Sequence, residues 1–239
     1  AGAKDESGNY KPRLRAARVR RGLGTGMSGV FLSLFALAAA ANALSIRCKR
    51  ARIQAVAKIC LLPLLAAYYC AEARLFLPQV TLALFFGWVG DLFLIKIKKP
   101  CFVIAGLSSF LIGHLCYIFS LLPFIVVPHM PALVVSSAGM CAFALGVFAA
   151  VKPAKKLLAP AVCYSLALAA LLVCAVQLVL CRRDAAGFSI AAGSLCFLAS
   201  DTVLACFSCR KMTPRVNFAV MLTYSAAQSC LIIGLAHCR

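Results

Sequence analysis

The chain has 239 residues, of which 64% are hydrophobic and 13% are charged, about half the charged fraction of roughly 25% in ordinary soluble domains. A soluble domain of this size cannot bury so much apolar surface, so the composition predicts that lipid covers the outside of the fold. The net charge of +19 does not indicate a nucleic-acid-binding protein. The basic residues gather in the N-terminal segment and in short gaps between apolar runs, where cations set membrane topology and contact lipid headgroups.

The N-terminal segment, residues 1–26, is polar, basic and contains glycine, which predicts a flexible tail ahead of a single transmembrane domain at 27–239. The first apolar run has two interpretations. A basic stretch, an apolar core and Ala41-Asn42-Ala43 together are also the pattern of a signal peptide and its cleavage site. Retention of the run gives eight helices and cleavage gives seven, and we favour retention.

Eight apolar runs follow one another along the chain, each of about 19 to 24 residues, which is enough to cross roughly 30 Å of hydrocarbon as a helix. Most prolines lie in the gaps, and Pro63 lies inside the second run, where a kink is tolerated in a membrane. We therefore predict an all-α integral membrane bundle with spans at about 28–46, 53–71, 79–97, 101–124, 132–151, 158–180, 187–208 and 216–236.

The loop charges divide into two sets. The gaps after runs 1, 3, 5 and 7 contain thirteen cations, and the remaining gaps and the C-terminus contain four. The positive-inside rule places the first set in the cytosol. The basic N-terminal tail favours the opposite orientation, and we give the four agreeing loops more weight.

The fourteen cysteines are scattered along the apolar runs without the spacing of a metal site or a disulfide framework, so we interpret them as buried free thiols. Cys206 and Cys209 form one CxxC at a helix end, with neither a second pair nor a nearby histidine. We predict no metal and no cofactor.

Two acidic residues lie well inside apolar runs, Asp91 in GWVGDLFLI and Asp201 in CFLASDTVLA; the other four lie in the tail or at run ends. A carboxylate at mid-membrane costs about 2.5–3.5 kcal/mol on insertion scales, so such a residue indicates function. Runs 3 and 7 have the same direction. Both aspartates therefore lie roughly 5 Å from the midplane, toward the leaflet that carries the more basic loops.

Other polar residues lie at compatible depth. His114 and Tyr117 share one face of run 4, since they are three residues apart, and Tyr224 and Gln228 share one face of run 8. Ser200 flanks Asp201, although hydroxyls in membrane helices usually bond to backbone. Lys58, near the start of run 2, fits a snorkelling residue better than a site residue, and we keep it with Ser200 among the candidate supporting residues.

The two halves of the chain echo each other. Asp91 precedes His114 by 23 residues, Asp201 precedes Tyr224 by 23, and both aspartates begin an Asp-x-x-Leu. This pattern hints at a parallel four-plus-four repeat, in which runs 3–4 correspond to runs 7–8.

Four motifs occur in an order and spacing that resemble one family. They are GxxGDxxL at 87–94, AGLSSFLIGHLCY at 105–117, FLASDTVLA at 197–205 and TYSAAQ at 223–228, and they look like those of the lysoplasmalogenases, the YhhN-like eight-helix membrane proteins. There are two departures. Ser225 replaces the second tyrosine of the last motif, and the family's Lys-x-Leu-Pro is stretched here between Lys58 and Pro63.

The resemblance implies hydrolysis of the vinyl ether bond of lysoplasmalogens, which yields a fatty aldehyde and a glycerophospho-base. Protonation of the β-carbon and capture of the cation by water require one carboxyl as acid and one carboxylate as its partner. Asp91 and Asp201 are the candidates for this pair. His114 would orient an aspartate or relay a proton, and Tyr117, Tyr224 and Gln228 would position water or headgroup. The expected partners are the lysophospholipid and membrane lipids, with no nucleic acid, and the family suggests the endoplasmic reticulum in animals.

Two other functions are compatible with intramembrane aspartates. A transporter or lipid-binding protein would use them to bind a proton or cation, and a four-plus-four repeat suits a transporter too. A zinc-dependent lipid hydrolase needs three or four ligands, and His114 is the one histidine placed deep in a run. Aldehyde production without any gradient separates an enzyme from a transporter.

Overall fold

The computed structural model describes residues 11–95, 100–152, 155–208 and 213–238. Every regular element in these ranges is a helix, which confirms the predicted all-α fold. The helices are α1 Lys11–Arg47, α2 Ala51–Glu72, α3 Pro78–Ile95, α4 Pro100–Leu121, the short 3₁₀ helix η1 Leu122–Phe124, α5 Met130–Val151, α6 Lys155–Arg182, α7 Ala185–Ser208 and α8 Pro214–His237.

Eight helices of the described chain are long and apolar enough to cross a membrane, and they coincide with the eight predicted runs. The first of these spans covers Gly26–Arg47. Helix α1 begins earlier than the sequence predicts, at Lys11, because arginine, alanine and leucine favour helix on the N-terminal side of the span. The segment predicted as a flexible tail is therefore helical from Lys11, and residues 1–10 lie outside the described ranges.

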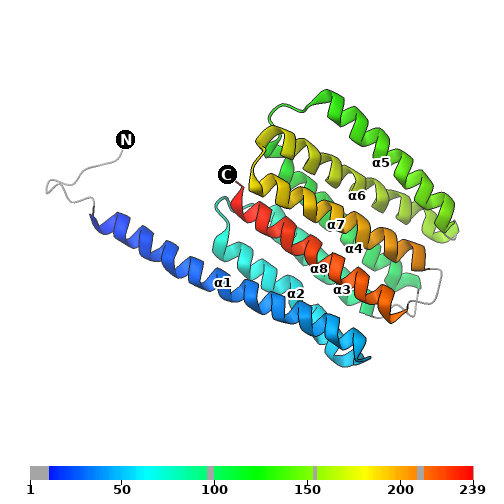
Figure 1. Ribbon diagram of the computed structural model, residues 1–239, viewed down its shortest axis with the longest axis horizontal. Coiled ribbons are helices and arrows are strands. Elements are labelled where there is room, and N and C mark those ends of the chain that lie inside the picture. The colour runs from blue at the N-terminus through cyan, green and yellow to red at the C-terminus, as the bar shows by residue number, and fades with distance from the viewer. Residues whose placement is uncertain (1–10, 96–99, 153–154, 209–212, 239) are drawn as a thin grey trace.

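The helices lie side by side in one bundle, with α5 at one edge and α1 and α2 at the other (Figure 1). Sequence neighbours form three closely packed pairs, α1–α2, α3–α4 and α7–α8. The contacts that join the halves include one between α4 and α6 and one between α8 and α2. In a parallel repeat α2 and α4 correspond to α6 and α8, so the contact between α4 and α6 corresponds to the contact between α8 and α2.

Glycines allow the closest helix pairs to approach. A Cβ added at Gly90 of α3 would lie 2.7 Å from the ring of Phe110 on α4. A Cβ at Gly193 of α7 would lie 2.7 Å from the backbone nitrogen of Leu231 on α8. At Gly90 the space of the missing side chain is filled by the Phe110 ring, and at Gly193 the backbones of α7 and α8 themselves approach, so both glycines bring the helices that carry the aspartates near to their partners.

Helix α1 is part of the bundle. It packs against α2 and α8, and it buries Phe35, Asn42 and Ile46. At its membrane-spanning start, the Ser28 hydroxyl donates to Glu72 of α2 at 2.7 Å. Removal of this helix would expose the faces of α2 and α8 that it covers, which supports the interpretation with eight helices.

The cysteines differ in position from the prediction. The described cysteines are free thiols, but seven of them are exposed on the bundle surface: Cys48, Cys60, Cys70, Cys101, Cys141, Cys163 and Cys181. A thiol is small and apolar enough to face lipid as readily as a protein core, so the apolar pattern of the sequence did not distinguish the two. Cys209, the second residue of the CxxC, lies outside the described residues.

Candidate active site

Asp91 lies near the end of α3, with 2% of its surface exposed, and it has two charged or polar partners. The Lys58 ammonium of α2 lies 3.0 Å from Oδ1, and the Tyr224 hydroxyl of α8 donates to Oδ2 at 2.7 Å. The ammonium balances the charge of the carboxylate, and both oxygens are satisfied, which a buried ionised carboxyl requires. Lys58 thus points into the bundle, and the snorkelling interpretation is wrong.

Helix α2 lacks one backbone hydrogen bond next to this ion pair. Pro63 has no backbone N–H, so the carbonyl of Ile59 loses the donor that a regular helix would supply. The Trp88 indole of α3 replaces it, because its Nε1 donates to that carbonyl at 3.1 Å. This hydrogen bond joins α2 to α3. Its two residues are one position after Lys58 and three positions before Asp91, so it helps to hold the two charges together.

Asp201 lies on α7 and is partly exposed. Its Oδ2 accepts a hydrogen bond from the Tyr164 hydroxyl of α6, and no cation is paired with it among the residues that the structure describes. The neighbouring Ser200 donates to the Val220 carbonyl of α8 at 3.2 Å. Ser200 therefore joins two helices and does not contact the carboxyl group.

A layer of aromatic rings lies between the two aspartates. The Tyr224 ring, whose hydroxyl binds Asp91, packs edge-to-face on Phe197 with 5.8 Å between centroids. Phe197 packs on His114 at 4.9 Å, and His114 packs on Tyr164 at 5.3 Å. Because the Tyr164 hydroxyl binds Asp201, ring contacts connect the partners of both aspartates.

Tyr117 and Gln228 extend the hydrogen bonds around Asp91. The Tyr117 hydroxyl of α4 donates to Oε1 of Gln228 on α8 at 2.8 Å, and both residues are buried. Gln228 lies one turn along α8 from Tyr224, whose hydroxyl donates to Asp91. Polar side chains of α4 and α8 are therefore buried together near Asp91, within one apolar bundle.

His114 is 2% exposed and contacts neither carboxyl group through a hydrogen bond. Its Nδ1 lies 2.7 Å from the Phe110 carbonyl, one turn earlier on α4. Its Nε2 is buried and has no hydrogen-bond partner among the described residues. The expectation that His114 orients an aspartate directly is therefore not what the geometry shows.

Sequence reasoning missed two residues of this constellation, Tyr164 and Phe197. Tyrosine and phenylalanine are common in membrane spans, so neither stands out by residue type. The four-plus-four echo offered a signal for Tyr164, since α6 corresponds to α2, and α2 supplies Lys58 to the equivalent aspartate.

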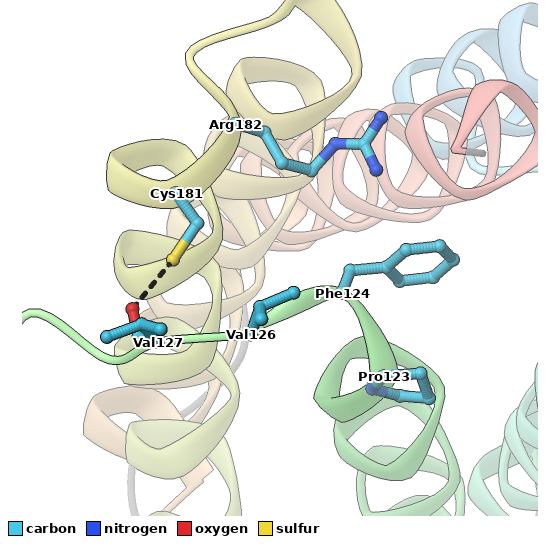
Figure 2. Close-up of a pocket in the computed structure, with 6 residues that line it drawn as sticks. All are labelled: Pro123, Phe124, Val126, Val127, Cys181 and Arg182. Atoms are coloured by element: carbon cyan, nitrogen blue, oxygen red, sulfur yellow. Dashed lines mark hydrogen bonds between the residues drawn. The ribbon is translucent and has the colours of Figure 1, made fainter.

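A separate hollow of about 390 Å³ lies at the other end of the bundle, between the segment that follows α4 and the end of α6. Figure 2 shows Arg182 extending toward the Phe124 ring, whose centroid lies 5.5 Å from the guanidinium carbon, and the Cys181 thiol directed at the Val127 carbonyl. The same guanidinium pairs with Asp184 at 2.8 Å. This hollow lies near the membrane surface opposite the aspartates, so it is not part of their site.

The fold is that of a multi-pass membrane protein, and it holds two aspartates among aromatic and polar side chains inside the helix bundle. The chain belongs to the YhhN family, which matches residues 53–235 and is the family of YhhN-like lysoplasmalogenases. The matched region begins in α2 and ends in α8, so it includes every residue of the site. No curated protein and no solved structure is similar enough to the chain to count as a match.

Proposed function

We propose that this protein is a lysoplasmalogenase, which hydrolyses the vinyl ether of a lysoplasmalogen to a fatty aldehyde and a glycerophospho-base such as glycerophosphocholine or glycerophosphoethanolamine. Membership of the YhhN family supports the class of reaction. The observation that carries the proposal is the unequal environment of the two aspartates, because Asp91 is paired with an ammonium and Asp201 with a neutral hydroxyl.

The chemistry needs this inequality. A vinyl ether is cleaved when an acid transfers a proton to its β-carbon, which creates an oxocarbenium ion with positive charge on the α-carbon and the ether oxygen. Water then adds to the α-carbon, and the hemiacetal that forms separates into aldehyde and alcohol. One carboxyl must therefore hold a proton, and the other must be an anion that stabilises the cation, as in glycosidases.

We assign the acid to Asp201 and the anion to Asp91. The Lys58 ammonium keeps Asp91 ionised, since an opposite charge favours the charged form. Asp201 lacks such a cation among the described residues, and a carboxyl in an apolar membrane interior takes up a proton rather than remain an unpaired charge. Its Oδ2 accepts from Tyr164, which leaves Oδ1 to carry the proton.

The arrangement of the bundle suits a lipid substrate. The aspartates lie toward the end of the bundle where Arg47, Lys49, Arg50 and Arg215 gather at helix ends. These cations would hold the phosphate of the headgroup, and the alkenyl chain would lie among apolar helices in the membrane. We propose the endoplasmic reticulum as the compartment, from the family resemblance alone.

The test compares purified protein on lysolipids with vinyl ether, alkyl ether and ester chains, without any ion gradient. We expect aldehyde from the vinyl ether alone. In D₂O the aldehyde should carry one deuterium at the carbon next to the carbonyl, since the acid delivers its proton there. Asp91→Asn and Asp201→Asn should each abolish aldehyde release while the protein stays folded. No aldehyde from the unmodified protein, together with proton or cation binding at the aspartates, would instead favour a transporter.

A further inference from the structure

The hydrogen bond of His114 fixes which of its nitrogens carries a proton. The Phe110 carbonyl can only accept a hydrogen bond, so Nδ1, at 2.7 Å, must be the donor in this contact. A neutral imidazole then has a lone pair and no proton on Nε2. That nitrogen is buried and has no partner among the described residues, although a buried polar atom of this kind normally has one.

The two halves of the site indicate what Nε2 faces. In one half of the site, α3 supplies the carboxyl group of Asp91 and α8 supplies the ring of Tyr224. In the other half, α7 supplies the carboxyl group of Asp201 and α4 supplies the ring of His114. His114 follows Asp91 by 23 residues, and Tyr224 follows Asp201 by 23. In the first pair the Tyr224 hydroxyl reaches the carboxylate directly, at 2.7 Å. In the second the imidazole is shorter than a phenol, and it contacts Tyr164, the partner of Asp201, through its ring.

We propose, on the basis of the proposed function, that His114 is a catalytic residue that binds the attacking water through Nε2 and takes its proton. Because the imidazole is shorter than the phenol, the proposal places one water molecule against Nε2, at the Asp201 side of the aromatic layer. Long helical side chains lean toward the N-terminus of their own helix, so the imidazole is directed toward Phe110 and the end of the bundle where the aspartates lie.

The reaction returns each residue to its starting protonation state. Asp201 transfers its proton to the β-carbon, and the π electrons of the double bond form the new C–H bond. The water oxygen bonds to the α-carbon of the cation as one water proton passes to Nε2 of His114. The imidazolium then returns this proton to the glycerol oxygen as the C–O bond breaks, and the hemiacetal hydroxyl proton restores Asp201. One water is consumed, and no oxidant or reductant is needed.

A bound water matters because the substrate contains a competing nucleophile. A lysolipid has a free hydroxyl on the neighbouring glycerol carbon, and attack by this hydroxyl on the cation closes a five-membered cyclic acetal. That product is an isomer of the substrate, since no water is consumed. An enzyme that releases aldehyde must therefore deliver water faster than the hydroxyl can close the ring.

The experiment measures the ratio of aldehyde to cyclic acetal. His114→Asn retains an amide that can donate to the Phe110 carbonyl but removes the basic nitrogen. General-base catalysis contributes about 10²–10⁴-fold, so the ratio should fall by at least about 100-fold while substrate is still consumed. His237→Asn is the matched control. The His237 Nδ1 makes the same contact, with the Ile233 carbonyl one turn earlier at 2.9 Å, but this residue lies at the end of α8 away from the aspartates, so its substitution should leave the ratio unchanged.

The outcomes separate this inference from the proposed function. An unchanged ratio in His114→Asn, or an equal fall in His237→Asn, overturns the role of His114 while vinyl ether cleavage stands. No consumption of vinyl ether by the unmodified protein overturns both.

If His114→Asn does not fold, methanol added to the unmodified protein provides the test. A water bound by His114 keeps the mixed methyl acetal at background, and formation of that acetal in proportion to methanol overturns the inference.

Discussion

Replacing Lys58 with methionine should destabilise the protein more than any exposed lysine substitution, because it leaves the carboxylate of Asp91 without its cation. Methionine has a similar length and is apolar, so the change removes the charge and little volume. Asp91 is 2% exposed and lies 3.0 Å from the ammonium, so water does not screen the pair. The hydrogen bond from Tyr224 remains, but a neutral hydroxyl does not compensate a charge.

The magnitude follows from the geometry of the pair. At an effective dielectric constant of about 20, two unit charges at this distance attract by about 5 kcal/mol, and desolvation offsets part of that gain. Removal of one partner of a buried pair costs about 3–5 kcal/mol, since it leaves an uncompensated charge. We expect Lys58→Met to lose stability in this range. Activity should fall at least about tenfold, because Asp91 would take up a proton and no longer stabilise a cation.

A double-mutant cycle measures the interaction. The unmodified protein, Lys58→Met, Asp91→Asn and the double variant are unfolded in mixed detergent micelles, and the four free energies of unfolding are compared. The double variant should recover at least about 2 kcal/mol relative to the sum of the two single losses, since neither charge remains buried. If the two single losses add up to the loss in the double variant, Lys58 and Asp91 do not interact. That result would refute the assignment of Asp91 as the anion.

Two further predictions concern stability. Gly90→Ala should cost about 1–3 kcal/mol because the new methyl group overlaps the Phe110 ring, whereas Gly139→Ala, with open space around it, should cost nothing measurable in thermal unfolding. The Arg182 hydrogen bond holds the pKa of Asp184, between α6 and α7, below its ordinary value of 3.8. Ionised Asp184 therefore stabilises the fold above about pH 4. Asp184→Asn should lose under about 1 kcal/mol at neutral pH, and that difference should vanish as the pH falls through the lowered pKa; a constant difference from pH 7 to 3 would refute this.

The spans and the aspartates could be predicted from the sequence because both depend on the cost of polar groups in hydrocarbon. That cost makes a 20-residue apolar run a helix, and it makes Asp91 and Asp201 conspicuous. It does not say which helices are neighbours. Lys58 was therefore misjudged, since a lysine seven residues into its helix can reach either the headgroups or a carboxylate on α3.

Tyr164 could not be selected from the sequence by residue type, because its importance depends on the packing of α6 against α7, which brings its hydroxyl to Asp201. The exposed cysteines also could not be placed from the sequence. Lipid and protein interior are alike to an apolar side chain, so hydropathy alone does not orient a helix about its axis.

The contact between Trp88 and the Ile59 carbonyl has a practical consequence. Trp88 is the one tryptophan in the sequence, so all indole fluorescence of the protein comes from the junction of α2 and α3 beside Lys58 and Asp91. Emission of an indole shifts with its hydrogen bonding and with the polarity around it. Binding of a lysolipid or a change in the ion pair can therefore be followed optically in the unlabelled protein, and quenching by brominated lipids would report how deep in the bilayer this junction lies.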